Sequence, residues 1–266
     1  MKLNCARSAV KSKSVVGLIM GNILITGASR GIGAATARLL ASKGHNVCVN
    51  YKTNAALAQE LVQEAKKLGV NAIAVQADVC QEDQVVALFA TIDEQLGPVT
   101  GLVNNAGILL PQMPLEEMSA ARINTLLTTN VTSYFLCCRE AIKRMALKHG
   151  GQGGAIVNVS SAAARIGGAF EYIDYAASKG AIDTLTRGLS VEVAQQGIRV
   201  NCVRPGFIAT DMHADGGEPN RIERVKGAIP MRRVGQPEEV ASAIAWLLSD
   251  QASYITGSFT DIAGGR

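Results

Sequence analysis

Residues 21–40 read GNILITGASRGIGAATARLL, an apolar run followed by a glycine-rich turn and an alanine-rich stretch. Glycines at such a turn let the backbone bend sharply, admit a pyrophosphate and allow a helix to pack closely against a strand, with the phosphates at the helix N-terminus. A glycine triplet alone also serves as a purely structural turn, but its place directly after a first strand favours phosphate binding. We therefore predict a dinucleotide site that includes Gly27, Ser29, Arg30, Gly31, Ile32 and Gly33.

The rest of the chain alternates short apolar runs with longer stretches of helical spacing, which is typical of βα units around a parallel sheet. Continuous runs such as IVNV and VNCV indicate strands that are buried on both faces. An amphipathic helix is predicted over 237–250. The pattern predicts an α/β fold, a doubly wound seven-stranded parallel sheet with helices on both faces, with strands at 23–26, 47–51, 72–77, 101–103, 155–160, 199–203 and 258–261.

Length and charge indicate one domain without a nucleic-acid partner. The 266 residues, 48% of them hydrophobic, are enough for one large domain, which we place at 21–266. The net charge of +4 matches the four basic residues and absence of acids in residues 1–20. The remaining chain is formally neutral, which argues against nucleic-acid binding. The apolar run over 15–25 is too short to span a bilayer, so no membrane segment is expected.

Residues 1–20 form an extra basic leader, which we expect to be disordered or not native to the protein. A methionine at position 20 stands directly before the first strand pattern and favours an upstream start or an added extension. The basic, acid-free composition also has a weak transit-peptide character, which stays an alternative.

Cysteine and histidine usage argues against disulfides and metals. The six cysteines include no CxxC pair and most have apolar neighbours, which indicates small buried side chains in a reducing, cytoplasmic setting. The three histidines are far apart and have no ligand spacing around them. We therefore expect no metal site.

The segment over 206–236 does not fit the alternating pattern. It is rich in glycine and proline and lies between a predicted strand and the last helix. Long irregular insertions in compact domains are more often functional than not. We predict a lid here, with Phe207, Met212 and His213 as candidates to line a substrate pocket. For His213, a solvent-facing position on the lid is the favoured alternative.

Tyr175 and Lys179 stand four residues apart in EYIDYAASKGAIDTL, residues 171–185. If this run is helical from 174 onward, Lys179 lies one turn from Tyr175, whereas Tyr172 has no such partner and lines the substrate mouth or packs. A nearby ammonium favours the phenolate, so we expect the pKa of Tyr175 to fall below its usual value of about 10. Tyr175 is then able to exchange a proton with a substrate oxygen.

Further motifs follow in order: NNAG at 104–107, Asn130, a serine pair at 160–161 and YAASK at 175–179. With the GxxxGxG spacing of the first turn, they make the sequence resemble the short-chain dehydrogenase/reductase family over 21–266. The most similar patterns are those of 3-oxoacyl-carrier-protein reductases and glucose dehydrogenases. The resemblance implies a single-domain Rossmann fold and a catalytic set of Asn130, Ser161, Tyr175 and Lys179.

The resemblance also implies roles for these residues. Ser161 would hydrogen-bond the substrate oxygen, Lys179 the nicotinamide ribose, and Asn130 a water that relays protons through Lys179. Ser160 stays an alternative to Ser161, because the span to Tyr175 is one residue longer than in many relatives. The implied cofactor contacts beyond the first turn are Asn50, Tyr51, Lys52, Asp78, Val79, Asn105, Ala106, Gly107, Tyr175, Lys179, Pro205, Gly206, Ile208 and Thr210.

The end of the second strand, in NVCVNYKTN, bears on cofactor choice. Enzymes that select NAD usually place an acid here, where it accepts hydrogen bonds from the ribose hydroxyls. This chain has Asn50, Tyr51 and Lys52 instead, and Lys52 and Arg30 are able to pair with a 2′-phosphate. We expect NADP(H) rather than NAD(H). The alternatives are that Lys52 is a solvated surface charge and that Asp78 is a helix cap instead of an adenine contact.

Together these features predict an NADP(H)-dependent oxidoreductase that reversibly reduces a carbonyl to a secondary alcohol. The alternatives are an NADPH-binding regulator without turnover and a sugar dehydrogenase working in the oxidative direction. By the family resemblance, Gln196 stands where carrier-protein reductases often have arginine. This difference weakens the prediction of an acyl-carrier-protein partner but does not remove it, because Lys143, Arg144 and Lys148 remain nearby in sequence. The family resemblance implies a homotetramer, with a dimer as the alternative, and the apolar, small-residue faces over 120–147 and 174–194 suit the helix pairing that it would need.

Overall fold

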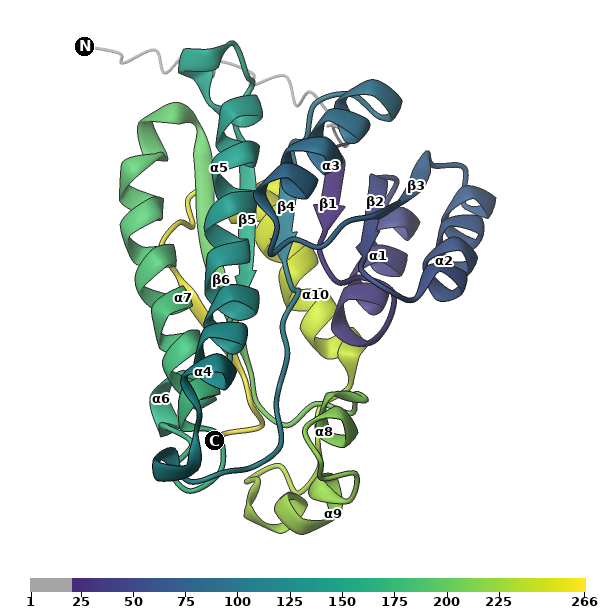
Figure 1. Ribbon diagram of the computed structural model, residues 1–266. Helices are drawn as coiled ribbons and strands as arrows, with labels where there is room; N and C mark the ends of the chain where they lie inside the picture. Colours follow the sequence, from purple (N-terminus) through teal and green to yellow (C-terminus); the bar gives the residue numbers. More distant parts are fainter. Residues whose placement is uncertain (1–20) are drawn as a thin grey trace, which may run out of the picture.

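The computed structural model describes residues 21–266, and the predicted basic leader over 1–20 lies outside the described residues. The described residues form one parallel sheet in the order β3-β2-β1-β4-β5-β6-β7 (Figure 1). All seven predicted strands are confirmed, and their ends lie within two residues of the prediction. The strands are β1 Asn22–Ile25, β2 Asn46–Tyr51, β3 Ala72–Gln76, β4 Gly101–Asn104, β5 Gly154–Val159, β6 Ile198–Pro205 and β7 Phe259–Ile262.

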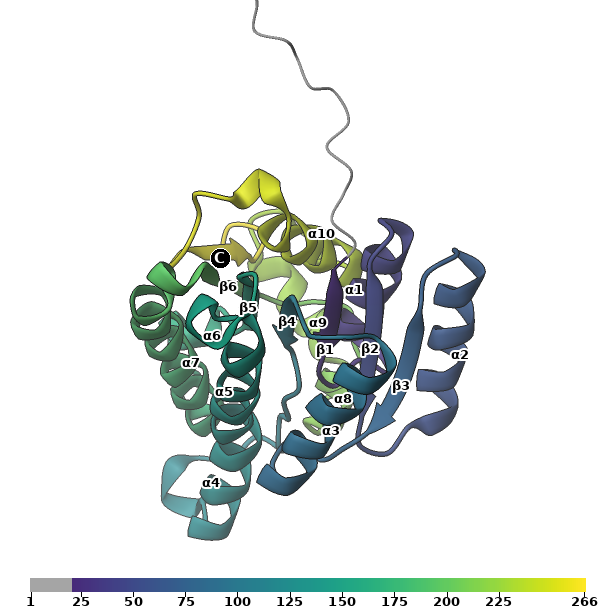
Figure 2. The ribbon, with the colours of Figure 1, turned by 90° about the horizontal axis from the view of Figure 1, so that it is seen from above.

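Helices cover both faces of the sheet (Figure 2). Side chains of successive strand residues alternate between two apolar layers, so Ile23 and Ile25 lie in one layer and Leu24 in the other. This arrangement confirms the predicted doubly wound α/β fold. The first layer is covered by α1 Gly31–Ser42, α2 Ala55–Lys67 and α10 Pro237–Leu248, and the second by α3 Glu82–Gln95, α5 Ser133–Met145 and α7 Ile173–Glu192.

The strand order reverses at β1, which pairs with β2 on one side and with β4 on the other. Ile23 lies opposite Val47 in β2 and opposite Gly101 in β4. In open α/β sheets, ligands bind at the carboxyl ends of the strands next to such a reversal. The loops after β1, β4, β5 and β6 therefore converge on one end of the molecule, and they carry most of the predicted site residues.

Residues 206–236 leave the sheet after β6 and return to it before α10. At the base of this segment, the backbone N–H of Gly235 donates to the oxygen of Phe207 at 2.9 Å. The segment is less irregular than expected, because it holds α8 Met212–Asp215 and α9 Arg221–Val225. Both helices lie beyond the carboxyl ends of the strands (Figure 1). We call residues 206–236 the lid, and its movement stays a prediction.

Over residues 21–266, no helix is both long and apolar enough to cross a bilayer. In the same residues, no three His, Cys, Asp or Glu side chains are grouped so that they could hold a metal ion. The five cysteines of this part of the chain are free, and four of them are buried.

Candidate active site

The glycine turn between β1 and α1 has the shape that a pyrophosphate needs. Gly27 has a φ of 59°, and a Cβ at this position would lie 2.9 Å from the Cα of Ala106, so only glycine fits. Helix α1 then begins at Gly31, and no side chain in residues 21–266 caps its N-terminus by a hydrogen bond. The first N–H groups of such a helix are available to phosphate oxygens.

The loop after β4 packs against this turn. Asn105 Nδ2 donates to the backbone oxygens of Thr26 and Gly27 at 2.9 and 3.1 Å. Thr26 Oγ1 in turn accepts from the backbone N–H groups of Asn105 and Ala106, both at 3.0 Å. The NNAG motif therefore holds the glycine turn in place. Asn105 also lines the cavity that contains Ser161 and Tyr175, described below.

Of the second-strand residues expected to choose the cofactor, two are buried. Asn50 is 2% exposed, accepts from the Gly27 N–H at 3.3 Å and donates to the Ala77 oxygen at 3.0 Å. Tyr51 packs in the apolar layer beneath α1 and α2. The amide of Asn50 therefore supports the glycine turn, and of these three residues only Lys52 has an exposed side chain.

Lys52 is paired with the acid that follows the third strand. Its Nζ lies 2.7 Å from the carboxylate of Asp78, and this hydrogen bond raises the pKa of Lys52. Helix α3 begins only at Glu82, and the carboxylate of Asp78 accepts from the N–H of Cys80 in the preceding turn. The alternative that Asp78 caps this helix is therefore wrong. Val79 beside it is buried.

Arg30 reaches from the glycine turn to the lid. Its side chain is 45% exposed, and its guanidinium pairs with Asp211 at 3.4 Å and also with Asp215. These carboxylates engage the group that we expect to bind a 2′-phosphate. A nucleotide phosphate at Arg30 would therefore compete with two acids of the lid, and the same contact joins the cofactor end to the lid.

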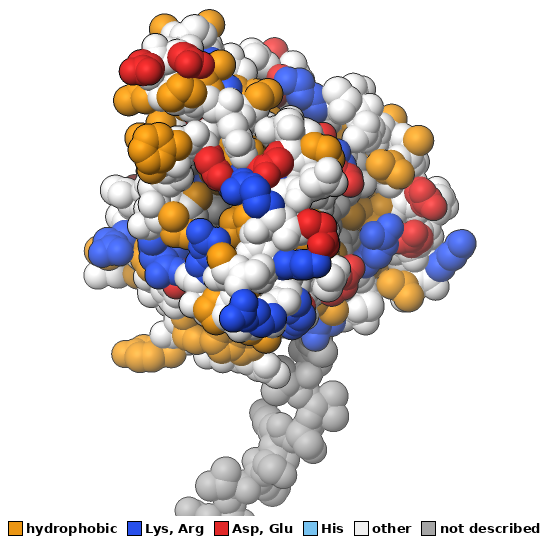
Figure 3. Space-filling model, turned by 90° about the horizontal axis from the view of Figure 1, so that it is seen from below, with side chains coloured by type: hydrophobic (Ala, Val, Ile, Leu, Met, Phe, Trp, Pro, Cys, Tyr) orange, Lys and Arg blue, Asp and Glu red, His pale blue; other side chains and the backbone are white. Residues whose placement is uncertain are grey.

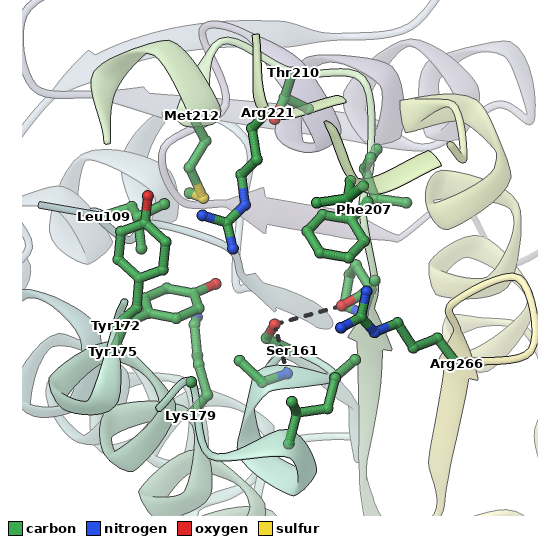
Figure 4. A pocket seen from close by; sticks show the side chains of 18 of the residues that line it. Leu109, Ser161, Tyr172, Tyr175, Lys179, Phe207, Thr210, Met212, Arg221 and Arg266 are labelled. Carbon is green, nitrogen blue, oxygen red and sulfur yellow. Dashed lines mark hydrogen bonds between the residues drawn. The ribbon is translucent and has the colours of Figure 1, made fainter. Parts of the chain in front are cut away.

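Ser161, Tyr175 and Lys179 line one cavity of about 340 Å³ at the carboxyl edge of the sheet. Ser161 follows β5, and Tyr175 and Lys179 lie in the first two turns of α7, which confirms the predicted helix. Figure 4 shows the hydroxyl groups of Ser161 and Tyr175 pointing into the same part of the cavity, with Lys179 beside the Tyr175 ring. The structure thus brings the predicted tyrosine, lysine and serine together.

Lys179 is almost completely buried, at 3% exposure. Its Nζ donates to the Val159 oxygen at 2.8 Å and to the Tyr134 hydroxyl at 3.4 Å, and burial lowers the pKa of Lys179 to about 8. Tyr134 was not among the predicted site residues, although it contacts the site lysine. The only signal for it is a position four residues after Asn130, which places both on one helical face.

The expected lowering of the Tyr175 pKa is wrong for this structure. Burial raises the pKa of Tyr175 above its usual value, and a hydrogen bond with Ser161 offsets only part of the rise. The Lys179 ammonium donates to the Val159 carbonyl and lies 5.6 Å from the centre of the Tyr175 ring, so its charge does not reverse the effect. Tyr175 therefore holds its proton at neutral pH.

The two serines after β5 have different surroundings. Ser160 is 2% exposed, and its hydroxyl donates to the backbone oxygen of Lys179 at 3.0 Å. Ser161 accepts from the N–H of Ala163 at 3.1 Å and donates to the Pro205 oxygen at a long 3.4 Å. The weak donation leaves the Ser161 proton available to another acceptor, which favours Ser161 over Ser160.

Asn130 lies in a π-helical turn, Thr128–Thr132, between α4 Ala120–Leu127 and α5. Its Oδ1 accepts from the Ile108 N–H at 2.8 Å, and its Nδ2 donates to the Ile108 oxygen at 3.0 Å. A Cβ at Gly107 would lie 3.3 Å from Asn130 Oδ1 and 3.7 Å from Lys179 Nζ, so these two groups approach the same point. Such π-turns frequently occur at functional sites.

The cavity is mostly apolar, with charged groups at a few points. Phe207 and Met212 line it as predicted, whereas the side chain of His213 lies outside the described part of the chain. Tyr172 also lines it and donates from its hydroxyl to the Gly216 oxygen at 3.3 Å. The cavity also includes the predicted residues Ile32, Pro205, Gly206, Ile208 and Thr210, and three arginines that no motif indicates, Arg221, Arg224 and Arg266.

The basic residues considered for a carrier protein lie at the amino ends of the strands, whereas the cavity lies at their carboxyl ends. Helix α5 ends in the turn that holds Lys143 and Arg144, next to the start of β5, whereas the cavity lies beyond the end of β5. Both residues pair with Glu140. The backbone N–H of Lys148 donates to the Gln196 side chain at the same end. These three residues therefore do not lie at the mouth of the cavity in the same chain.

The doubly wound parallel sheet, with the glycine turn after β1 and the cavity at the carboxyl ends of its strands, is that of a Rossmann-fold protein. More particularly, the chain belongs to the short-chain dehydrogenase/reductase family. The family model described as Enoyl-(Acyl carrier protein) reductase matches residues 27–266. The chain is 64% identical over 247 residues to the uncharacterized oxidoreductase YgfF of Escherichia coli (strain K12), which covers 93% of this chain and 100% of that protein.

Two further similarities concern named proteins. The chain is 38% identical over 242 residues to the 3-oxoacyl-(acyl-carrier-protein) reductase FabG of Staphylococcus aureus, with 91% of this chain and 96% of that protein covered. A crystal structure of a blue fluorescent protein from a metagenomic library, in complex with NADPH, matches with a TM-score of 0.85 and 34% identity. That match covers 92% of this chain and 97% of the other.

Proposed function

We propose that this protein is an NADP(H)-dependent enzyme that reduces a carbonyl to a secondary alcohol, and that the reaction is reversible. The observation that carries the proposal is the convergence of Ser161, Tyr175 and Lys179 on one cavity beside the glycine turn. A regulator without turnover has little physical need for a buried lysine beside the half-buried Tyr175, because burial of an ammonium costs free energy. Membership of a family of oxidoreductases supports the same reading.

The chemistry follows from the proton that Tyr175 holds. When bound, the nicotinamide would supply the hydride in reduction and accept it in oxidation. Tyr175 gives its proton to the carbonyl oxygen and takes it back from the alcohol in the reverse direction. Its raised pKa keeps the phenol protonated at neutral pH, which suits reduction. Ser161 donates a hydrogen bond to the same oxygen and holds it beside Tyr175.

Lys179 and Asn130 complete the proposed catalytic set. Lys179 binds the ribose next to the nicotinamide and stabilises the negative charge that remains on Tyr175 after proton transfer. Asn130 anchors a water that returns a proton through Lys179, as the family resemblance implies. Support for this path is the close approach of Asn130 Oδ1 and Lys179 Nζ to Gly107.

Arg30 and Lys52 support the choice of NADP(H) over NAD(H). Both are exposed cations, and residues 50–52 at the end of β2 include no acid that could accept hydrogen bonds from the ribose hydroxyls. A guanidinium matches a phosphate group in shape and charge. The similarity to a protein whose structure contains NADPH supports the same choice. We place the adenine beside Asp78 and Val79.

The test is a panel of ketones, diketones, quinones, 3-oxoacyl thioesters and sugars, assayed with NADPH, NADP, NADH and NAD in both directions. The proposal expects reduction of at least one carbonyl class with NADPH and a clearly lower kcat/KM with NADH. The Arg30→Ala variant should lose affinity for NADPH more than for NADH, because only NADPH carries the 2′-phosphate.

The alternatives give different results in the same panel. Oxidation of sugars with no matching reduction of ketones would identify a sugar dehydrogenase. Tight NADPH binding with no consumption across the panel would identify a regulator. An equal loss of NADPH and NADH affinity in Arg30→Ala would show that this residue does not bind the 2′-phosphate.

We also propose that the protein self-associates, as a homotetramer, in a reducing compartment such as the cytoplasm. Support for association is the set of large apolar side chains left exposed on α5 and α7, including Phe135 at 52% and Val191 at 77%. Support for the compartment is that the five described cysteines are free. The test of association is the molar mass in solution.

A further inference from the structure

The lining of the cavity carries more cations than carboxylates. Its residues include four cations, Lys179, Arg221, Arg224 and Arg266, and one carboxylate, Glu171. Lys179 lies beside Tyr175, whereas Arg221 and Arg266 lie away from it. The rest of the lining is largely apolar, with side chains such as Leu109 and Met212. Ligand pockets of this kind use a few placed polar groups to fix the orientation of an otherwise apolar molecule.

Arg221 and Arg224 are balanced by acids. Arg221 pairs with Glu171 and with Glu218 at 3.2 Å, and Arg224 pairs with the same two carboxylates. The four side chains together have no net charge. Acidic and basic side chains also lie side by side across the face of the molecule that bears the lid (Figure 3). This quartet therefore joins the lid to the loop before α7 and does not by itself select an anion.

Arg221 nevertheless presents a guanidinium to the cavity. The residue is 7% exposed, and the guanidinium carbon lies 4.6 Å from the centre of the Tyr172 ring and 5.5 Å from that of Phe207. Figure 4 shows this guanidinium in the space opposite the hydroxyl groups of Tyr175 and Ser161. A guanidinium has five N–H donors, and the two acids use only part of them.

Arg266 differs from the quartet because it has no acid partner. Within residues 21–266, no Asp or Glu side chain forms an ion pair with its guanidinium, which lies 5.1 Å from the centre of the Phe207 ring. Its backbone oxygen accepts from Arg165 at 3.0 Å, and Arg165 pairs with Asp261 of β7. Figure 4 shows Arg266 reaching toward the cavity from the side of Phe207.

We propose that the cavity binds an oxo carboxylate, with the carboxylate of the substrate on Arg266 and within reach of the Arg221 donors. This inference rests on the proposed function, in which the ketone oxygen meets Ser161 and Tyr175. One unpaired guanidinium balances one negative charge, which favours a carboxylate over a phosphate dianion. The apolar lining favours an aliphatic or aromatic body between the two groups. The reaction product is then the corresponding hydroxy acid.

The test uses a ladder of keto acids with increasing spacing between the two groups, from 4-oxopentanoate to 7-oxooctanoate, each paired with its amide. The amide keeps size and shape and removes the charge. With NADPH, the proposal expects at least one acid to exceed its amide in kcat/KM by about tenfold or more, the value of one charged hydrogen bond. Equal values for every pair would overturn it.

The variants Arg266→Gln and Arg266→Lys test whether Arg266 causes the preference for the acid over its amide. Gln at this position should reduce the acid-to-amide ratio by about tenfold, and Lys should restore part of it, because the charge returns without the guanidinium shape. The matched control is Arg38→Gln, an exposed arginine of α1 paired with Glu64 and outside the cavity lining. A ratio that is unchanged in Arg266→Gln would contradict the proposal.

Binding of the same probes separates this inference from the proposed function. Calorimetry on the NADP-loaded protein should give tighter binding of the best acid than of its amide, and Arg266→Gln should remove the difference. If the amides and neutral ketones are reduced as well as the acids, the carbonyl reductase stands and the carboxylate subsite fails. If acids bind through Arg266 and no ketone is reduced, the subsite stands and the reductase fails.

Discussion

At the scale of single residues, the burial of Lys179 has a cost in folding stability. The fall of its pKa from 10.5 to about 8 corresponds to roughly 3 kcal/mol that opposes the charged form in the folded state. Below about pH 8, Lys179 is protonated in both the folded and the unfolded chain, so the folded state carries the full free-energy cost of the buried ammonium. Between about pH 8 and 10.5 the unfolded chain holds more protons than the folded chain, so stability rises with pH.

The substitution Lys179→Met tests this account. Met keeps the apolar stem and removes the charge, so the variant should be more stable than the wild type by about 1–3 kcal/mol at pH 7. The gain should shrink as the pH rises towards 10.5, and turnover should be lost. Urea unfolding at several pH values measures the difference. The control Lys66→Met, on the exposed face of α2, should change stability by less than about 0.5 kcal/mol. A destabilised Lys179→Met would contradict the account.

A second residue pair fixes the position of Tyr175. Asp174 accepts from the Tyr175 N–H at 2.8 Å and pairs with Arg122 of α4 at 2.9 Å, and its side chain is only 2% exposed. The Arg122→Met variant leaves this carboxylate buried without a cation and should destabilise the fold by about 3–5 kcal/mol. Thermal and urea unfolding measure the loss.

The control for this pair is an exposed one. Arg38→Met breaks the contact with Glu64 on the surface and should cost less than about 1 kcal/mol. The double variant Arg122→Met with Asp174→Leu should recover much of the lost stability, because neither charge remains buried. Equal losses for Arg122→Met and Arg38→Met would show that burial of Asp174 is unimportant.

Single-residue predictions from sequence succeeded where they used local spacing. The four-residue spacing of Tyr175 and Lys179 predicted their meeting on α7, because helix geometry fixes that contact. The pKa direction of Tyr175 was not predictable, since it depends on burial by distant segments. For the same reason no pattern indicated Arg221, which enters the cavity from the lid.

At the scale of elements, the contact between the glycine turn and the lid should affect cofactor affinity. Asp211 and Asp215 pair with Arg30, the residue proposed to bind the 2′-phosphate. The Asp215→Asn variant should therefore bind NADPH more tightly, by up to about fivefold, because an exposed ion pair is worth at most about 1 kcal/mol. NADH affinity should change little. Fluorescence titration of both nucleotides measures the two values.

The lid offers a matched control for this experiment. Glu223 is also an exposed lid acid, but it pairs with Lys226 rather than with Arg30. Glu223→Gln should leave the affinity for both nucleotides unchanged. If Asp215→Asn weakens NADPH binding, or alters NADH by the same factor, competition at Arg30 is not the mechanism.

The elements themselves were predictable to different degrees. The strands were found from sequence because they are buried on both faces and read as short apolar runs, as in β1 and β5. Helices α8 and α9, of four and five residues, are too short to show a helical period. The direction of α5 explains why Lys143 and Arg144 lie far from the cavity, since a crossover helix returns to the start of the next strand.

At the scale of the whole molecule, α5 and α7 offer apolar side chains to another copy of the chain. If the proposed tetramer forms through them, Phe135→Glu and Val191→Glu should each shift the molar mass towards dimer or monomer, because a charge would be buried in the interface. Light scattering after size-exclusion chromatography measures the mass. The control is Leu68→Glu directly after α2, because Leu68 is 55% exposed, close to the value for Phe135. A mass that is unaffected by the first two changes would exclude this interface.

The most direct test of the central claim is turnover and NADPH affinity of Tyr175→Phe, with a carbonyl that the wild type reduces. The account predicts a fall in kcat of about 10²- to 10⁴-fold, the usual contribution of a positioned acid, because Phe keeps the ring and removes the proton. NADPH affinity should stay close to that of the wild type, because the phenol donates its proton to the substrate and not to the cofactor. Turnover near the wild-type rate would contradict the assignment of Tyr175 as the proton donor.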